Sequence, residues 1–196
     1  MDFTIAAVSA IIGFVLLLAG IPKLTEYDGV LRSVRGYKVL PSGLEGPVAR
    51  ALPIAETVAG ALLVTGIARQ WAAGVAALMF SSFFVGLVVN LARGRRDLDC
   101  GCFAFGIGEI PRIGWFHAVR AGILAAASLS ILAIGSAAGA GAQATAATLA
   151  LLLVLAGVAI AQIRSVVHFG KRPVDDYLSS ASIRLRAAGA TSRYGV

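Results

Sequence analysis

The first apolar stretch of the chain, residues 3–21, reads FTIAAVSAIIGFVLLLAGI and contains no charged residue. A helix needs roughly 20 mainly apolar residues to cross a bilayer, because every backbone polar group in lipid must be paired inside the segment. The stretch therefore predicts a membrane-spanning helix over Phe3–Ile21. Met1 and Asp2 supply no positive charge and Gly20–Lys23 is a poor cleavage site, so we do not interpret the stretch as a signal peptide.

Four further stretches have the same length and character, and they run from Val48 to Ala68, Trp71 to Ala92, Ile113 to Gly135 and Ala144 to Ile163. The 196 residues are 58% hydrophobic and 14% charged, more apolar surface than a water-soluble core of this size could bury. The sequence therefore predicts an all-α integral membrane helical bundle over residues 1–165, followed by a basic cytoplasmic tail, residues 166–196. Gly and Ala are frequent in all five spans, which favours close packing of the helices.

The distribution of basic residues predicts the orientation of the bundle. Fifteen of the 17 Lys and Arg residues lie in the first connection, at the start of the second span (Arg50), in the third connection or in the tail. The other two are Arg69, on the opposite side, and Arg120, inside the fourth span. Because basic connections stay in the cytoplasm, we expect a multi-pass protein of the inner (plasma) membrane with its N-terminus outside and its C-terminus cytoplasmic. The net charge of +7 is thereby explained by topology, and we expect no nucleic acid as a partner.

The two cysteines of the chain stand one residue apart in the third connection, within Asp99-Cys100-Gly101-Cys102-Phe103. Gly101 lacks the Cβ that would oppose the tight turn needed to join the two sulfurs. A disulfide so close in sequence is strained and easily reduced, which favours a transient redox pair over a structural bridge. We therefore predict that Cys100 and Cys102 are the catalytic residues, in a setting where nearby Arg95 and Arg96 favour a thiolate and Asp97 and Asp99 oppose it.

Three other interpretations of the cysteine pair stay open. With His117 the two thiolates could hold a soft ion such as Cu(I), but a closed zinc site needs four ligands and the second histidine, His168, follows the fifth span. We therefore predict no metal site. Two free thiols could instead pack under the loop, or they could be acylated at the membrane face.

Glu56 lies inside the second span, where an ionised carboxylate is unfavourable unless it has a partner. The available cations are Arg120 in the fourth span and Lys23 at the end of the first. A Glu56–Arg120 pair would fix the second span against the fourth and orient the cysteine loop, which directly precedes the fourth span. Alternatively, a protonated Glu56 relays a proton during thiol chemistry or binds a quinone oxygen.

Several short motifs follow one another along the chain: Lys23-Leu24, Tyr37 with Leu40-Pro41, Leu52-Pro53 with Glu56 and Gly60, Asp99-Cys100-Gly101-Cys102-Phe103, and Arg120. Their order resembles that in the MauE branch of the DoxX-like membrane proteins, a family associated with methylamine utilisation. The resemblance covers about residues 5–135 and implies a four-helix core. The fifth span and the basic tail are additions to that core.

The resemblance implies a thiol-disulfide redox protein that exchanges electrons with extracytoplasmic thioredoxin-like partners, for a client such as the small subunit of methylamine dehydrogenase. It implies supporting roles for Lys23, Glu56, Asp99 and Arg120. Because the charge distribution places the cysteine loop toward the cytoplasm, we expect a relay that carries electrons across the bilayer. Two other functions stay open: a non-catalytic assembly subunit of a larger membrane complex, and a quinone-linked oxidoreductase subunit with its quinone near Glu56 or Arg120.

Overall fold

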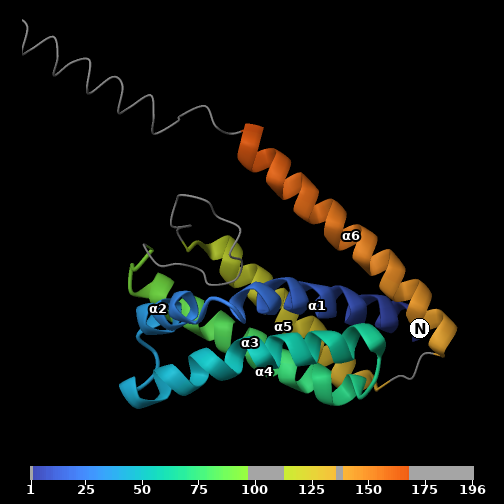
Figure 1. Cartoon of the computed structure of the whole chain (residues 1–196), viewed down its shortest axis with the longest axis horizontal. Helices are drawn as coiled ribbons and strands as arrows, with labels where there is room; N and C mark the ends of the chain where they lie inside the picture. The colour runs from blue at the N-terminus through green and yellow to red at the C-terminus, as the bar shows by residue number, and fades with distance from the viewer. Residues whose placement is uncertain (1, 97–112, 136–138, 168–196) are drawn as a thin grey trace, which may run out of the picture. The chain divides into compact units, whose positions relative to one another are not determined.

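The computed structural model describes residues 2–96, 113–135 and 139–167, with side chains described as far as Ile163. The described residues form helices and no strand (Figure 1). The helices are α1 (Asp2–Lys23), α2 (Tyr27–Tyr37), α3 (Ser42–Thr65), α4 (Arg69–Ala92), α5 (Trp115–Ile134) and α6 (Ala140–Val167). All except α2 are long and apolar enough to cross a membrane, so the predicted all-α membrane bundle is confirmed.

The helix boundaries differ from those of the predicted spans, most clearly in α3. This helix begins at Ser42 rather than Val48. Its first turns are helical but polar, so they add nothing to the apolar stretch from which the span was predicted. It ends at Thr65 rather than Ala68, because Gly66 adopts a left-handed conformation (φ 76°) and its N–H donates to the Leu62 carbonyl. Hydropathy therefore located the part of α3 that can lie in lipid, and the helix itself starts earlier.

Helix α2 lies in the first connection, where the sequence had suggested only a charged segment. Val30 is its buried residue, and Arg32 and Arg35 are exposed. Arg35 Nε donates to Glu45 Oε2 at 3.0 Å, and the Arg50 guanidinium lies 5.2 Å from the centre of the Tyr27 ring. Both contacts join α2 to the first turns of α3.

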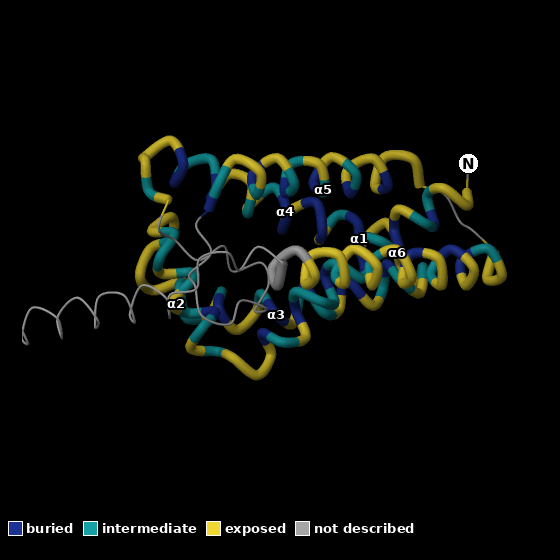
Figure 2. The backbone as a smooth tube through the Cα atoms, turned by 90° about the horizontal axis from the view of Figure 1, so that it is seen from above, coloured by how far each residue is buried: buried dark blue, intermediate teal, exposed yellow. Residues whose placement is uncertain are grey.

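The spanning helices pack mainly in two pairs, α1 with α3 and α4 with α5, and α3 also contacts α4. The interior is built from small residues and a few large apolar ones, including Ala10, Ile12, Leu16, Leu63, Ala73, Ala76 and Phe80. Figure 2 shows that α5 turns its buried residues toward the other helices and its exposed residues outward. Exposed apolar side chains such as Leu78 and Ile123 are expected of a surface that faces lipid.

The chain divides into two units, Met1–Val154 and Leu155–Val196. The first unit includes the start of α6, where Gln143 is buried. Gln143 Nε2 donates to the carbonyl oxygens of Val64 at 2.7 Å and Leu63 at 3.4 Å, and Gln143 Oε1 accepts a hydrogen bond from Arg69 Nη2. These carbonyls belong to the last turn of α3, where donors from the same helix run out. One side chain of α6 thus caps α3.

In the second unit the described part of α6 exposes its large apolar side chains, among them Leu155, Ile160 and Ile163. The predicted basic tail, residues 166–196, lies outside the described residues except for the last two positions of α6. Its cytoplasmic placement stays a prediction.

Candidate functional site

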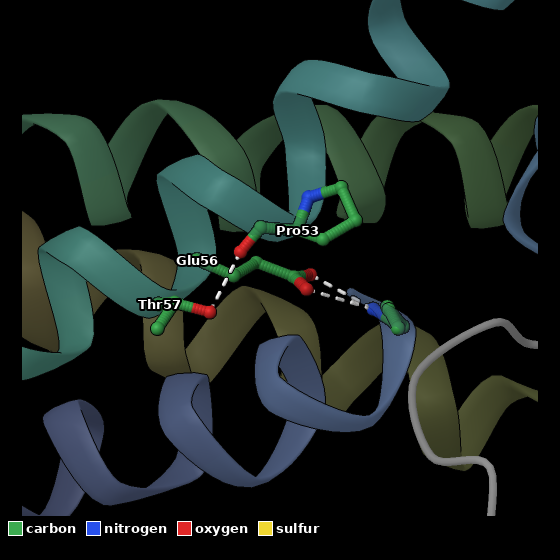
Figure 3. A network of polar contacts seen from close by, with 4 residues as sticks. Pro53, Glu56 and Thr57 are labelled. Atoms are coloured by element: carbon green, nitrogen blue, oxygen red, sulfur yellow. Dashed lines mark hydrogen bonds and ion pairs between the residues drawn. The ribbon is translucent and has the colours of Figure 1, made fainter. Parts of the chain in front are cut away.

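Lys23 and Glu56 form an ion pair inside the bundle, between the last residue of α1 and the middle of α3. Lys23 Nζ donates to both carboxylate oxygens of Glu56, at 2.9 Å to Oε1 and 3.0 Å to Oε2 (Figure 3). The two side chains are only 9% and 1% exposed. A buried ion pair is tolerated when both charges are satisfied in this way, and removing one partner leaves the other charge unpaired.

The local sequence explains why the two side chains meet. Gly20 stands one turn before Lys23, and a Cβ added there would lie 2.8 Å from the Cβ of Glu56. Only glycine lets α1 approach α3 this closely. Three residues before Glu56, Pro53 removes one helical N–H donor, and Thr57 Oγ1 donates to the Pro53 carbonyl at 2.8 Å (Figure 3). The Leu52-Pro53 motif and Gly20 therefore shape the backbone on the two sides of the pair.

A third helix contributes to this site through an aromatic ring. Lys23 Nζ lies 5.9 Å from the centre of the Phe83 ring on α4, within the range of a cation–π interaction. The ion pair, formed between α1 and α3, therefore also contacts α4, which belongs to the other pair of packed helices.

Of the two cations predicted as partners of Glu56, the structure selects Lys23, and the alternative pair with Arg120 is wrong. The reason is the pairing of helices, since α1 packs on α3 whereas α5, which carries Arg120, packs on α4. Arg120, on α5, is half-buried and takes part in an interaction of its own.

A second polar site surrounds Asn90, near the end of α4, and was missed in the sequence. Asn90 is fully buried. Its Nδ2 donates to the carbonyl oxygens of Gly86 at 2.9 Å and Tyr37 at 3.1 Å, and its Oδ1 accepts a hydrogen bond from Arg95 Nη1 at 3.2 Å. We call Asn90, Tyr37 and Arg95 the Asn90 junction. The signal that could have found it is a single amide residue in a mainly apolar span.

The predicted catalytic residues Cys100 and Cys102, and Asp99 beside them, lie outside the described residues, in what we call the cysteine segment, residues 97–112. The residues that flank this segment are described. The Ile113 N–H donates to the Arg96 carbonyl at 3.1 Å, and the Arg95 N–H donates to the Asn90 carbonyl at 3.0 Å. The two described residues on either side of the cysteine segment, Arg96 and Ile113, therefore lie next to each other, close to the Asn90 junction.

His117, the histidine considered as a copper ligand, lies in the first turn of α5. Its Nδ1 accepts a hydrogen bond from the Gly114 N–H at 3.2 Å, which caps the start of the helix. In the part of the chain that the structure describes, no three His, Cys, Asp or Glu residues group closely enough to hold a metal ion.

These features define a multi-pass helical membrane protein in which a buried Lys–Glu pair and a buried asparagine join helices within the bundle. The sequence profile of the family described as methylamine utilisation protein MauE matches residues 1–135. The chain belongs to this family, as its motifs predicted.

Two relatives illustrate the similarity. The methylamine utilization protein MauE of Methylophilus methylotrophus is 40% identical over 134 residues, 68% of this chain and 70% of the relative. The protein of the same name from Paracoccus denitrificans is 33% identical over 126 residues, 64% of this chain and 66% of the relative. No solved structure matches the chain. The profile match ends just after α5, so α6 lies beyond it.

Proposed function

We propose that this protein is a membrane thiol-disulfide redox component of methylamine utilisation, in which Cys100 and Cys102 are the reacting pair. The relatives are methylamine utilization proteins by name. The observation that carries the proposal is the Ile113–Arg96 hydrogen bond of 3.1 Å, which holds together the two described residues that flank the cysteine segment. A reactive pair works best when rigid elements hold the base that presents it.

The reaction is thiol-disulfide exchange with a thioredoxin-like protein. In the oxidising direction, the thiolate of one cysteine attacks the partner's disulfide, forms a mixed disulfide and releases one partner thiolate. The second cysteine then attacks the mixed disulfide and releases the other partner thiolate. The Cys100–Cys102 pair has lost two electrons and two protons, and the partner's disulfide has become a dithiol. The reverse sequence returns the electrons.

The proposed orientation places this pair toward the cytoplasm. Exposed basic residues at that end of the bundle are Arg32, Arg35, Lys38, Arg50, Arg93 and Arg96. Arg69, the one basic residue that the sequence assigned to the opposite side, is buried and donates to Gln143, so it adds no exposed positive charge there. This asymmetry supports a cytoplasmic C-terminal tail. Extracytoplasmic partners then require a relay of electrons across the bilayer.

We propose a positioning role for the Lys23–Glu56 pair. Because Lys23 engages both carboxylate oxygens, a quinone carbonyl would have to displace it before binding Glu56. The pair instead holds α1, α3 and α4 together. Asp99, directly before Cys100, and Arg120, on α5 after the cysteine segment, complete the proposed supporting set.

Trapping of mixed disulfides tests this function. Membranes from cells grown on methylamine are acid-quenched and alkylated, for the wild type, Cys100→Ser, Cys102→Ser and the double variant. We expect a covalent adduct, cleaved by reductant, in at least one single variant and none in the double variant, with mass spectrometry identifying the partner. Absence of adducts, together with normal growth of the double variant on methylamine, would instead support a non-catalytic assembly subunit.

A further inference from the structure

We propose that the second half of α2 is a binding surface for anionic phospholipid headgroups, formed by Arg32, Arg35 and Lys38. This surface is independent of the proposed redox chemistry. Two features carry it: the depth at which α3 holds α2 in the membrane, and the positive charges of α2 that have no carboxylate partner.

The first turns of α3 project beyond the hydrocarbon core of the bilayer. Helix α3 has 24 residues and is therefore about 36 Å long at 1.5 Å per residue, whereas the hydrocarbon core is roughly 30 Å thick. The excess length belongs at the Ser42 end, because that end is polar and carries Glu45, whereas the helix is apolar as far as Val64 at its other end. The start of α3 therefore lies among the headgroups.

Helix α2 is attached to this polar start of α3. Arg35 Nε donates to Glu45 Oε2 at 3.0 Å, and the Arg50 guanidinium lies 5.2 Å from the centre of the Tyr27 ring. Tyr27 is the first residue of α2 and Arg35 belongs to its last turn, so both ends of the helix are held at the level of residues 45–50 (Figure 1). Helix α2 therefore lies at headgroup depth.

The exposed charges of α2 are separated along the helix. The acidic residues lie at its start and the basic ones in its second half or directly after it; they are Glu26 and Asp28, and Arg32, Arg35 and Lys38. Arg32 and Arg35 are three residues apart, which makes them neighbours on the helix surface, where like charges repel each other. A bound anion would relieve this repulsion.

One of these three positive charges has a carboxylate partner among the described residues. Arg35 bonds to Glu45, whereas the side chains of Arg32 and Lys38 form no ion pair or hydrogen bond within the part of the chain that the structure describes. Arg35 is itself 62% exposed, and its pair with Glu45 engages only Nε. Guanidinium and ammonium groups form strong, charge-assisted hydrogen bonds with phosphate oxygens, which phospholipid headgroups present at this depth.

Lys38 ends α2 in a backbone conformation that favours glycine. Its φ is 49°, and its N–H donates to the Arg35 carbonyl at 3.2 Å. A positive charge at the end of a helix also stabilises the helix dipole without any lipid. The two roles predict different results, because the dipole acts in every membrane whereas headgroup binding requires an anionic lipid.

The test is the lipid selectivity of the full-length protein, measured by electron paramagnetic resonance with spin-labelled phosphatidylglycerol and phosphatidylcholine in reconstituted vesicles. The double variant Arg32→Gln/Lys38→Gln removes the two unpaired charges of α2. The matched control, Arg93→Gln/Arg96→Gln, removes two exposed positive charges beyond the last residue of α4. We expect the wild type to prefer phosphatidylglycerol by at least about threefold, the α2 variant to lose most of this preference, and the control to keep it.

Two results would overturn the proposal. Equal selectivity of the wild type for both lipids would mean that the α2 charges serve another anion, such as an acidic protein segment. An equal loss of preference in the control would mean that any positive charge near the membrane acts alike.

Thermal unfolding in vesicles of pure phosphatidylcholine separates binding from folding. We expect the Arg32→Gln/Lys38→Gln variant to unfold at the wild-type temperature there, because no anionic headgroup is present and neither side chain bonds to the described protein. A lower unfolding temperature would assign the two charges to the stability of α2 and contradict the proposal. Neither measurement depends on the cysteines, so failure of the redox function would leave this surface standing, and the reverse also holds.

Discussion

Gly13 of α1 and Gly60 of α3 pack backbone against backbone. A Cβ added to Gly13 would lie 2.7 Å from the Gly60 carbonyl oxygen, and one added to Gly60 would lie 2.8 Å from the Gly13 carbonyl oxygen. Small residues at a helix crossing allow this approach in a membrane, where packing rather than water drives association. The crossing sets the spacing of α1 and α3 and therefore the place where Lys23 meets Glu56.

The substitution Gly13→Ala tests this crossing. We expect it to lower the free energy of unfolding by roughly 1–3 kcal/mol, because backbone atoms cannot give way as a flexible side chain can. The matched control is Gly74→Ala in α4, where the added Cβ would lie 3.8 Å from Leu132 Cδ1, an ordinary contact. Unfolding by SDS in mixed micelles measures both. Equal stability of the two variants would mean that the crossing is looser than described.

The Lys23–Glu56 pair predicts strong coupling in a double-mutant cycle. Lys23→Met or Glu56→Gln alone should lower the free energy of unfolding by about 3–5 kcal/mol, because a buried group loses its partner. The double variant should be more stable than the sum of the two losses predicts. The control is Arg35→Gln, since Arg35 pairs with Glu45 but is 62% exposed, and such pairs contribute at most about 1 kcal/mol. Strictly additive losses would contradict the pairing.

Gln143 should hold the start of α6 to the end of α3. Gln143→Leu leaves the Leu63 and Val64 carbonyls without this donor, and we expect a loss of about 1–3 kcal/mol in the free energy of unfolding. Thr148→Val on the same helix is the control, because Thr148 is exposed and its hydroxyl bonds only within α6. If thermal unfolding of the two variants is the same, Gln143 does not cap α3 in the membrane.

The spanning helices could be predicted because lipid imposes a length and a polarity that appear directly in the sequence. Residues 3–21, for example, are uninterrupted by charge and correspond to α1. Helix α2 could not be predicted by that rule, since it is short and its one buried residue, Val30, depends on packing against other helices. The start of α3 at Ser42 could not be predicted for a related reason, because hydropathy detects only the part of a helix suited to lipid.

The residues of the candidate site could be predicted from the sequence, but only some of the contacts between them could. A carboxylate in a span requires a cation, so Lys23 and Glu56 were both identified. The choice between Lys23 and Arg120 depends on which helices pack together, and that depends on close contacts such as Gly13 with Gly60. Asn90 was missed because its partners include two backbone carbonyls. Every residue has a backbone carbonyl, so the sequence does not indicate which ones Asn90 bonds.

The most direct test of the central claim is a redox titration of the wild-type protein in lipid nanodiscs. Samples are equilibrated in glutathione buffers of varied ratio, acid-quenched and alkylated with a reagent that adds mass to each free thiol. The account predicts one two-electron transition, in which Cys100 and Cys102 become protected together. If both thiols stay reactive at every ratio, the pair does not cycle between dithiol and disulfide, and the redox account is wrong.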